Sequence, residues 1–124
     1  MDLLVETASS VIKGIKLTSD LPELHDNDRC PMLDIEVWAE REGENMTIRH
    51  SFYEKPVTSP MVFHANGVYD WRCKLVTMSE ELRRRLLHMD GKHSKKDTTN
   101  IVRKFFQKIE DSGYGKPARE EVIR

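Results

Sequence analysis

Residues 31–56, PMLDIEVWAEREGENMTIRHSFYEKP, carry the pattern of a β-hairpin. Leu33, Ile35 and Val37 alternate with Asp34, Glu36 and Trp38. A period of two puts the three aliphatic side chains on one face of a strand. The same alternation runs from Met46 to Phe52. The stretch therefore predicts two strands, each with its apolar residues on one face.

A turn is expected between these strands at residues 42–45, EGEN, because the glycine and the asparagine tolerate positive φ. Pro56 should end the second strand, since proline has no N–H to donate to a neighbouring strand. The register of the hairpin predicts that Phe52 is buried together with Ile48. Arg49, one residue out of phase, is expected to face solvent.

Helical periodicity marks the rest of the chain. Residues 1–15 predict an N-terminal helix, with Lys16 to Thr18 as a short strand after it and residues 21–31 as a polar loop.

The C-terminal half has helical spacing of its apolar residues. A helix that begins near Trp71 or at Thr77 and ends by Gly91 is predicted by Leu75, Met78, Leu82, Leu86 and Met89. A helix over 97–112 has Ile101, Val102, Phe105 and Ile109 as its apolar face, and a short last helix covers 117–123. These elements predict an α+β fold with an N-terminal helix, a small antiparallel sheet centred on the hairpin, and a C-terminal helical, helix-turn-helix-like bundle.

Bulk properties limit the class of protein. The chain has 124 residues and 33% charged side chains, which suits one globular domain or a piece of one. It has no apolar run of membrane-spanning length and no signal-peptide pattern, so we expect an intracellular protein that does not enter a membrane. Cys30 and Cys73 form no C-x-x-C pair and are expected to be free thiols.

The two halves of the chain differ in charge. Residues 1–60 contain 12 acidic and 6 basic side chains, a balance of -6, whereas residues 61–124 contain 9 acidic and 14 basic ones, a balance of +5. A basic half is typical of a surface that binds phosphate groups, although lysines and arginines also simply solvate helix faces. The sequence leaves both interpretations open.

The hairpin resembles a segment of the reverse transcriptases of animal retroelements, the Penelope-like elements and their relatives. In that family a strand reading "FLD-aliphatic" is followed, across a turn, by a strand that ends "aromatic, R or K, K, P". The matching residues here are 32–35, MLDI, and 52–56, FYEKP. Similar segments flank them in the same order, at 15–18, 74–86 and 112–114. Glu54 stands where the family has arginine.

The resemblance implies a division of the chain at residue 60, with the edge of a polymerase palm before it and a basic, thumb-like helical region after it. Reverse transcriptases bind two metal ions on palm carboxylates that include an adjacent aspartate pair. This chain has no adjacent aspartates. The resemblance therefore implies a fragment or remnant of an RNA-directed DNA polymerase that is inactive alone, with no cofactor of its own, because magnesium would be bound by the missing palm.

The expected partners are an RNA–DNA or DNA duplex and the remainder of the polymerase. Charge and resemblance together predict that a set of basic residues contacts the duplex backbone. The set consists of Lys55, Lys74, Arg83, Arg84, Lys92, Lys95, Lys96, Arg103 and Lys104.

Other functions fit parts of the sequence. Asp34 and Glu36 with Lys55 faintly resemble the site of a metal-dependent nuclease. Such a site has a glutamate and a lysine two residues apart on one strand, whereas Lys55 here follows Glu54 directly, so these two side chains face opposite sides of a strand. The acidic loop around His25 lacks the glycine that a hard-ion loop needs at its turn. His64 fits the resemblance loosely as a residue near the thumb-like helices. A stand-alone helix-turn-helix regulator or a protein-interaction module remains an open alternative.

Overall fold

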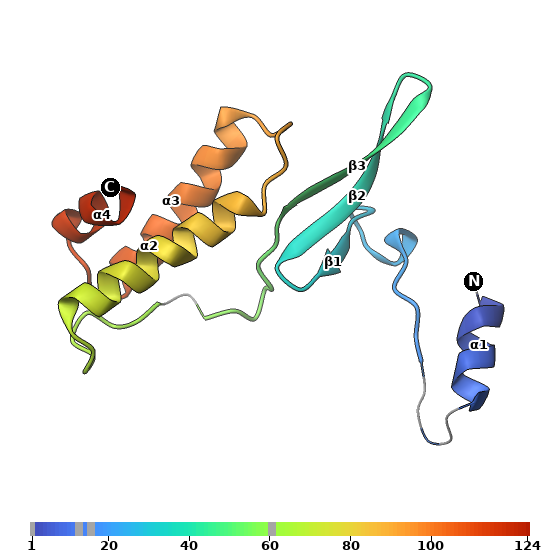
Figure 1. The fold of residues 1–124 in the computed structure, drawn as a ribbon, viewed down its shortest axis with the longest axis horizontal. Coiled ribbons are helices and arrows are strands. Elements are labelled where there is room, and N and C mark those ends of the chain that lie inside the picture. Colours follow the sequence, from blue (N-terminus) through green and yellow to red (C-terminus); the bar gives the residue numbers. More distant parts are fainter. Residues whose placement is uncertain (1, 12–13, 15–16, 60–61) are drawn as a thin grey trace.

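A computed structural model describes residues 2–11, 14, 17–59 and 62–124, and it has the expected α+β architecture. Three parts follow one another along the chain (Figure 1): an N-terminal helix, a three-stranded sheet and a C-terminal group of helices. The helices are α1 (Asp2–Val11), the 3-10 helix η1 (Pro22–Leu24), α2 (Trp71–Leu87), α3 (Lys95–Asp111) and α4 (Lys116–Ile123). The strands are β1 (Cys30–Met32), β2 (Ile35–Glu42) and β3 (Asn45–Phe52).

The hairpin predicted from residues 31–56 is confirmed. Strands β2 and β3 pair antiparallel, from Ile35 opposite Phe52 to Glu42 opposite Asn45. Gly43 lies in the turn between them with φ of +65°, a conformation that glycine adopts without steric cost. The alternation of side chains and the turn residues are both local signals, which explains why the sequence predicted this element.

Strand β1 was not predicted, and its presence corrects the assignment of Leu33 and Asp34. These two residues form a tight turn, so that Met32 pairs with Ile35 and β1 lies along the other edge of β2. Leu33 has φ of +56°, a left-handed conformation that a leucine rarely adopts. The apolar character of Leu33 concealed the turn, because turn residues are usually glycine, asparagine or aspartate.

The prediction of which face of the hairpin is buried was wrong. Ile48 is 74% exposed, whereas the side chain of Arg49 is only 12% exposed. Phe52 is half-buried at the end of the strand, between the sheet and the helices. The face that carries Arg49 lies against α3 and the loop before it, so polar side chains that form ion pairs occupy the covered face.

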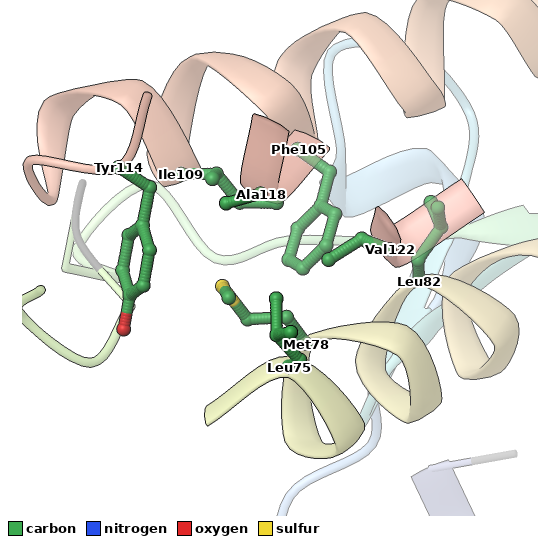
Figure 2. Packing of buried hydrophobic residues seen from close by; sticks show 8 residues of the cluster. All are labelled: Leu75, Met78, Leu82, Phe105, Ile109, Tyr114, Ala118 and Val122. Carbon is green, nitrogen blue, oxygen red and sulfur yellow. The ribbon is translucent and has the colours of Figure 1, made fainter. Parts of the chain in front are cut away.

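The hydrophobic core lies among α2, α3 and α4 (Figure 2). Antiparallel helices α2 and α3 contribute Leu75, Met78, Leu82, Phe105 and Ile109, as their spacing predicted. The chain after α3 adds Tyr114, Ala118 and Val122. Val62 and Ala65 of the loop before α2 pack against this cluster, so that loop docks on the core. The stability of the chain is therefore concentrated in its C-terminal half.

Capping residues set the ends of the helices. Helix α2 begins at Trp71, because the Asp70 side chain accepts a hydrogen bond from the N–H of Cys73. Thr77 therefore lies inside the helix and caps nothing. Helix α3 begins at Lys95, earlier than expected, since Ser94 and Asp97 form a reciprocal capping box. Lys95 and Lys96 thus belong to the first turn of a helix and not to a loop.

The N-terminal part departs most from its predicted form. Helix α1 ends at Val11, and Leu17 and Thr18 are not in a strand. Except for Gly14, the other residues of the predicted helix and strand, Met1, Ile12, Lys13, Ile15 and Lys16, lie outside the described residues. Helix α1 stands apart from the sheet and the bundle in Figure 1, with Leu3, Leu4 and Val11 exposed. Among the described residues, no helix is long and apolar enough to cross a membrane.

Candidate nucleic-acid interface

A groove runs between α3 and the covered face of the hairpin. It consists of two adjoining cavities of about 410 and 400 Å³. They share four lining residues, Glu36, Phe52, Ile101 and Lys104, and so form one continuous depression. Strands β2 and β3 and the segment after β3 supply one wall, and α3 supplies most of the other, from Asp97 to Lys108.

Two carboxylates in the groove are neutralised by cations of the same chain. Glu36 accepts hydrogen bonds from Arg29 at 2.6 Å and from the Ser51 hydroxyl at 3.0 Å. Glu54 accepts from Arg85 at 3.2 Å and also from Lys108. Burial alone would raise the pKa of Glu54, but the hydrogen bonds and positive charges of Lys108 and Arg85 outweigh burial and hold this pKa below its usual value. Glu36 and Glu54 therefore present no uncompensated charge to a ligand. Of the other two carboxylates that line the groove, Glu40 pairs with Arg49, and Asp97 is engaged by Ser94 in the capping box of α3.

Two lysines in the same groove are not neutralised. Lys55, in the segment after β3, and Lys104, in α3, both line it. Within residues 17–59 and 62–124, neither ammonium group is within ion-pair distance of a carboxylate. The groove therefore has an excess of positive charge that is available to an external anion.

The exposed face of α3 continues this positive surface. Lys96, Asn100 and Lys104 are spaced four residues apart, so they form one row along the helix, with Arg103 beside it. Lys96 and Arg103 are exposed and have no carboxylate partner in the described part of the chain. Arg103 donates a long hydrogen bond of 3.4 Å to the Asn100 side chain. Lys95 is also exposed, in the first turn of the same helix.

Three of the other predicted contact residues already have acidic partners. Lys92 contacts Glu42 at 2.5 Å, across the junction of loop and hairpin. Arg83 lies 3.4 Å from Glu80 within α2. Arg84 donates to Glu81 at 2.8 Å and contacts Asp34 at 2.5 Å.

Lys74 is not on the solvent-facing surface at all. It is 5% exposed, and its ammonium group donates to the carbonyl groups of Ala65 at 2.7 Å and Gly67 at 2.8 Å. It holds the loop before α2 against the start of that helix. This placement corrects its predicted role, because its charge is used inside the fold and no phosphate can reach it in this conformation.

A junction that the sequence did not reveal fixes the position of the sheet relative to α3. Arg49 donates to Asp90 at 2.7 Å and also contacts Glu40. The N–H of His50 donates to the same carboxylate of Asp90 at 3.0 Å, and His93 contacts the carbonyl oxygen of His50 at 2.8 Å. The loop between α2 and α3 thus binds the outer edge of β3. Residues 41 positions apart make the contact, so no local pattern in the sequence could have shown it.

The nuclease-like set does not come together. Asp34 lies in the turn before β2, not on the strand with Glu36, and it pairs with Arg84. Glu36 is engaged by Arg29. In the described part of the chain, no three histidine, cysteine or acidic side chains are arranged to bind a metal ion. These carboxylates serve as partners of arginines that connect the sheet to its surroundings.

The histidines of the two loops, His25 and His64, have local roles. His25 contacts Asp20 at 2.6 Å within the polar loop. His64 is exposed, and its ring accepts a hydrogen bond of 3.2 Å from the N–H of Asn66. It stabilises the loop before α2, and its ring lies near Gly113 after α3.

Comparison of the chain with known protein families, with curated proteins and with solved structures found no match.

Proposed function

We propose that this chain contacts the sugar-phosphate backbone of a nucleic-acid duplex, as a fragment or remnant of a retroelement reverse transcriptase without its catalytic carboxylates. The observation that carries the proposal is the face of α3 formed by Lys96, Arg103 and Lys104. These cations are exposed, and no carboxylate of the described residues neutralises them. The resemblance at residues 32–35 and 52–56 supports the choice of family, and Lys55 extends the surface into the groove.

Unpaired cations suit this role better than paired ones. A cation that meets a phosphate releases condensed counterions, and this release drives binding that is indifferent to sequence. Arg84 and Lys108 would first have to exchange an internal carboxylate for the phosphate. The N-terminus of α3 also carries the positive end of the helix dipole, which adds to the attraction near Lys95 and Lys96.

The test is to measure affinity for an RNA–DNA hybrid and for duplex DNA across a salt series. The affinity should be weak, similar for all sequences, and steeply reduced by salt. Changing both lysines in Lys95→Glu/Lys96→Glu should lower affinity and flatten the slope of log K against log salt by about 0.9 for each phosphate that is no longer neutralised. The helix should persist, because acidic residues are favourable in a first turn.

A control is Lys116→Glu, which makes the charge change of one of these two substitutions in α4, at an exposed lysine that pairs with Glu120. It should leave the salt slope unchanged. A flat salt response of the unaltered protein would rule out backbone contact by the basic half.

The helix-turn-helix regulator is less well supported by the geometry. In that motif a turn of three or four residues joins the two helices, whereas residues 88–94 join α2 to α3 here. One preferred duplex sequence, bound far above all others, would favour the regulator. No binding even at low salt would favour a protein-interaction module.

A further inference from the structure

We propose that the groove between the hairpin and α3 accepts one unpaired nucleotide of the bound nucleic acid. This inference rests on the proposed function and names the form of nucleic acid that the groove takes. It separates two surfaces: the exposed face of α3 contacts duplex backbone, and the groove beside it receives a base that is not paired.

The size of the groove supports a single nucleotide. Its two cavities of about 410 and 400 Å³ are each in the range of small-molecule sites, which is about 300 to 1,000 Å³. A double helix cannot enter a depression of this size between a strand and a helix. One nucleotide, with a flat base and one phosphate, is of the right scale.

The chemistry of the unused groups in the groove matches the parts of a nucleotide. Lys55 and Lys104 supply two cations for a phosphate, at the end lined by Tyr53. Asn100 lines the other cavity; its amide oxygen accepts from Arg103, and its NH2 group can donate to the edge of a base. Sites for single strands combine such a positive groove with an aromatic ring on which a base stacks.

Tyr53 is the ring that remains available for stacking. The ring of Phe52 is covered by guanidinium groups, with Arg84 at 5.6 Å and Arg85 at 4.7 Å from its centre. Trp38 is covered by Arg29 at 4.0 Å. Tyr53 contacts no other ring and no guanidinium group in the part of the chain that the structure describes.

The experiment compares three RNA–DNA hybrids in affinity: one with blunt ends, one with a single unpaired 3′ nucleotide, and one whose unpaired 3′ nucleotide lacks its base. The unpaired nucleotide should raise affinity about tenfold over the blunt hybrid, which is the usual effect of one stacked base. The abasic overhang should lose most of that gain, because it keeps the phosphate and lacks the stacking surface.

Two variants test which residues produce the gain. Tyr53→Leu should bring the ratio of overhang to blunt affinity close to one. Lys104→Gln, at an exposed position, should instead lower the affinity for both hybrids and reduce the ratio only in part, because Lys104 also lies on the duplex-facing side of α3. The matched control is Tyr69→Leu, at a tyrosine that is 56% exposed in the loop before α2, and it should keep the tenfold ratio.

The outcomes separate this inference from the proposed function. If the unaltered protein binds blunt and overhanging hybrids equally, or if the abasic overhang binds as well as the complete one, the groove takes no base and the inference is wrong. The same holds if Tyr53→Leu keeps the ratio. If no hybrid binds at any salt concentration, the proposed function itself fails.

Discussion

Arg49 shows how far the burial of one residue can depart from the expectation for its type. It lies on a strand at a position that alternation assigned to solvent, yet its side chain is 12% exposed and joins Glu40 of β2 to Asp90 of the loop before α3. Its guanidinium also lies 5.7 Å from the centre of the Trp38 ring. One side chain thus connects both strands of the hairpin to the helical bundle.

We expect Arg49→Ala to lower the free energy of unfolding several times more than Arg41→Ala does, because it leaves the carboxylate of Asp90 without its cation. The control, Arg41, is an exposed arginine of β2 whose only side-chain hydrogen bond in the described residues goes to the carbonyl of Gly43. Its expected change in the free energy of unfolding is within about 0.5 kcal/mol. Urea denaturation followed by circular dichroism measures both. Equal effects of the two substitutions would show that the junction contributes nothing to stability.

The partner of Arg49 leads to a prediction about pH. Burial alone would raise the pKa of Asp90, but hydrogen bonds from Arg49 and from the N–H groups of His50 and Lys92 outweigh burial and hold this pKa well below its usual value. The folded state therefore binds a proton at Asp90 less readily than the unfolded state does. Its stabilising effect is complete above the unfolded pKa of about 4 and is lost as the pH falls toward the folded pKa.

Measured unfolding free energies should accordingly fall more steeply between pH 5 and pH 2 in the unaltered protein than in Asp90→Asn. The asparagine variant should be less stable at pH 7, because it cannot form the ion pair with Arg49. A parallel pH dependence of the two proteins would mean that Asp90 titrates in the same way in the folded and unfolded states.

At the scale of elements, the helical hairpin and the β-hairpin bury very different amounts of apolar surface. Phe105 and Ile109 of α3 are fully buried against Met78 of α2. In the sheet, the apolar side chains of Met46 and Ile48 are mostly exposed. The alternation of β3 therefore sets its pairing with β2, while packing of the helices supplies most of the hydrophobic stabilisation.

This difference can be measured with two substitutions. Phe105→Ala should destabilise the chain by about 3 to 5 kcal/mol, because it removes a fully buried ring and leaves a cavity. Ile48→Ala should change stability by less than about 0.5 kcal/mol, since this side chain is 74% exposed. Thermal and urea unfolding of both variants would measure the two changes in the free energy of unfolding. A large loss in Ile48→Ala would indicate that another surface covers this face of the sheet.

At the scale of the whole molecule, ion pairs join its acidic and basic halves. The sheet and its flanking segments supply Asp34, Glu42 and Glu54, and the helical half supplies Arg84, Lys92 and Lys108 as their partners. Part of the positive charge of residues 61–124 is therefore used inside the fold. Four of the cations without an acidic partner among the described residues, Lys95, Lys96, Arg103 and Lys104, lie on α3, where the proposed contact with nucleic acid is made.

The chemistry of the whole chain leads to a prediction about activity. It has no adjacent aspartates, and its described residues form no metal-binding group. The proposed function, a remnant without the family's adjacent aspartates, implies that the isolated protein extends no primer on an RNA template with magnesium or manganese, because phosphoryl transfer needs metal ions at both reacting oxygens. Incorporation of nucleotides by a purified sample, abolished by Asp34→Ala, would contradict this expectation.

The sequence by itself determined the elements whose signals are local. The two strands and the turn of the hairpin followed from alternation and from Gly43, and the apolar faces of α2 and α3 followed from helical spacing. Gly113 follows the end of α3 with φ of +89°, a conformation that favours glycine. Each of these features depends on residues within one or two turns of each other.

Only the tertiary structure decided which side of the hairpin is covered and which cations remain available. Alternation specifies two faces of a strand but not which of them meets the helices, because that depends on residues far away in the sequence, such as Asp90 opposite Arg49. In the same way, nine basic residues looked equivalent in the sequence, yet Lys74 is buried and Arg84 is paired, whereas Lys104 is free of carboxylates in the described chain. An ion pair forms between groups that folding brings together, and the spacing of charges along the chain does not encode it.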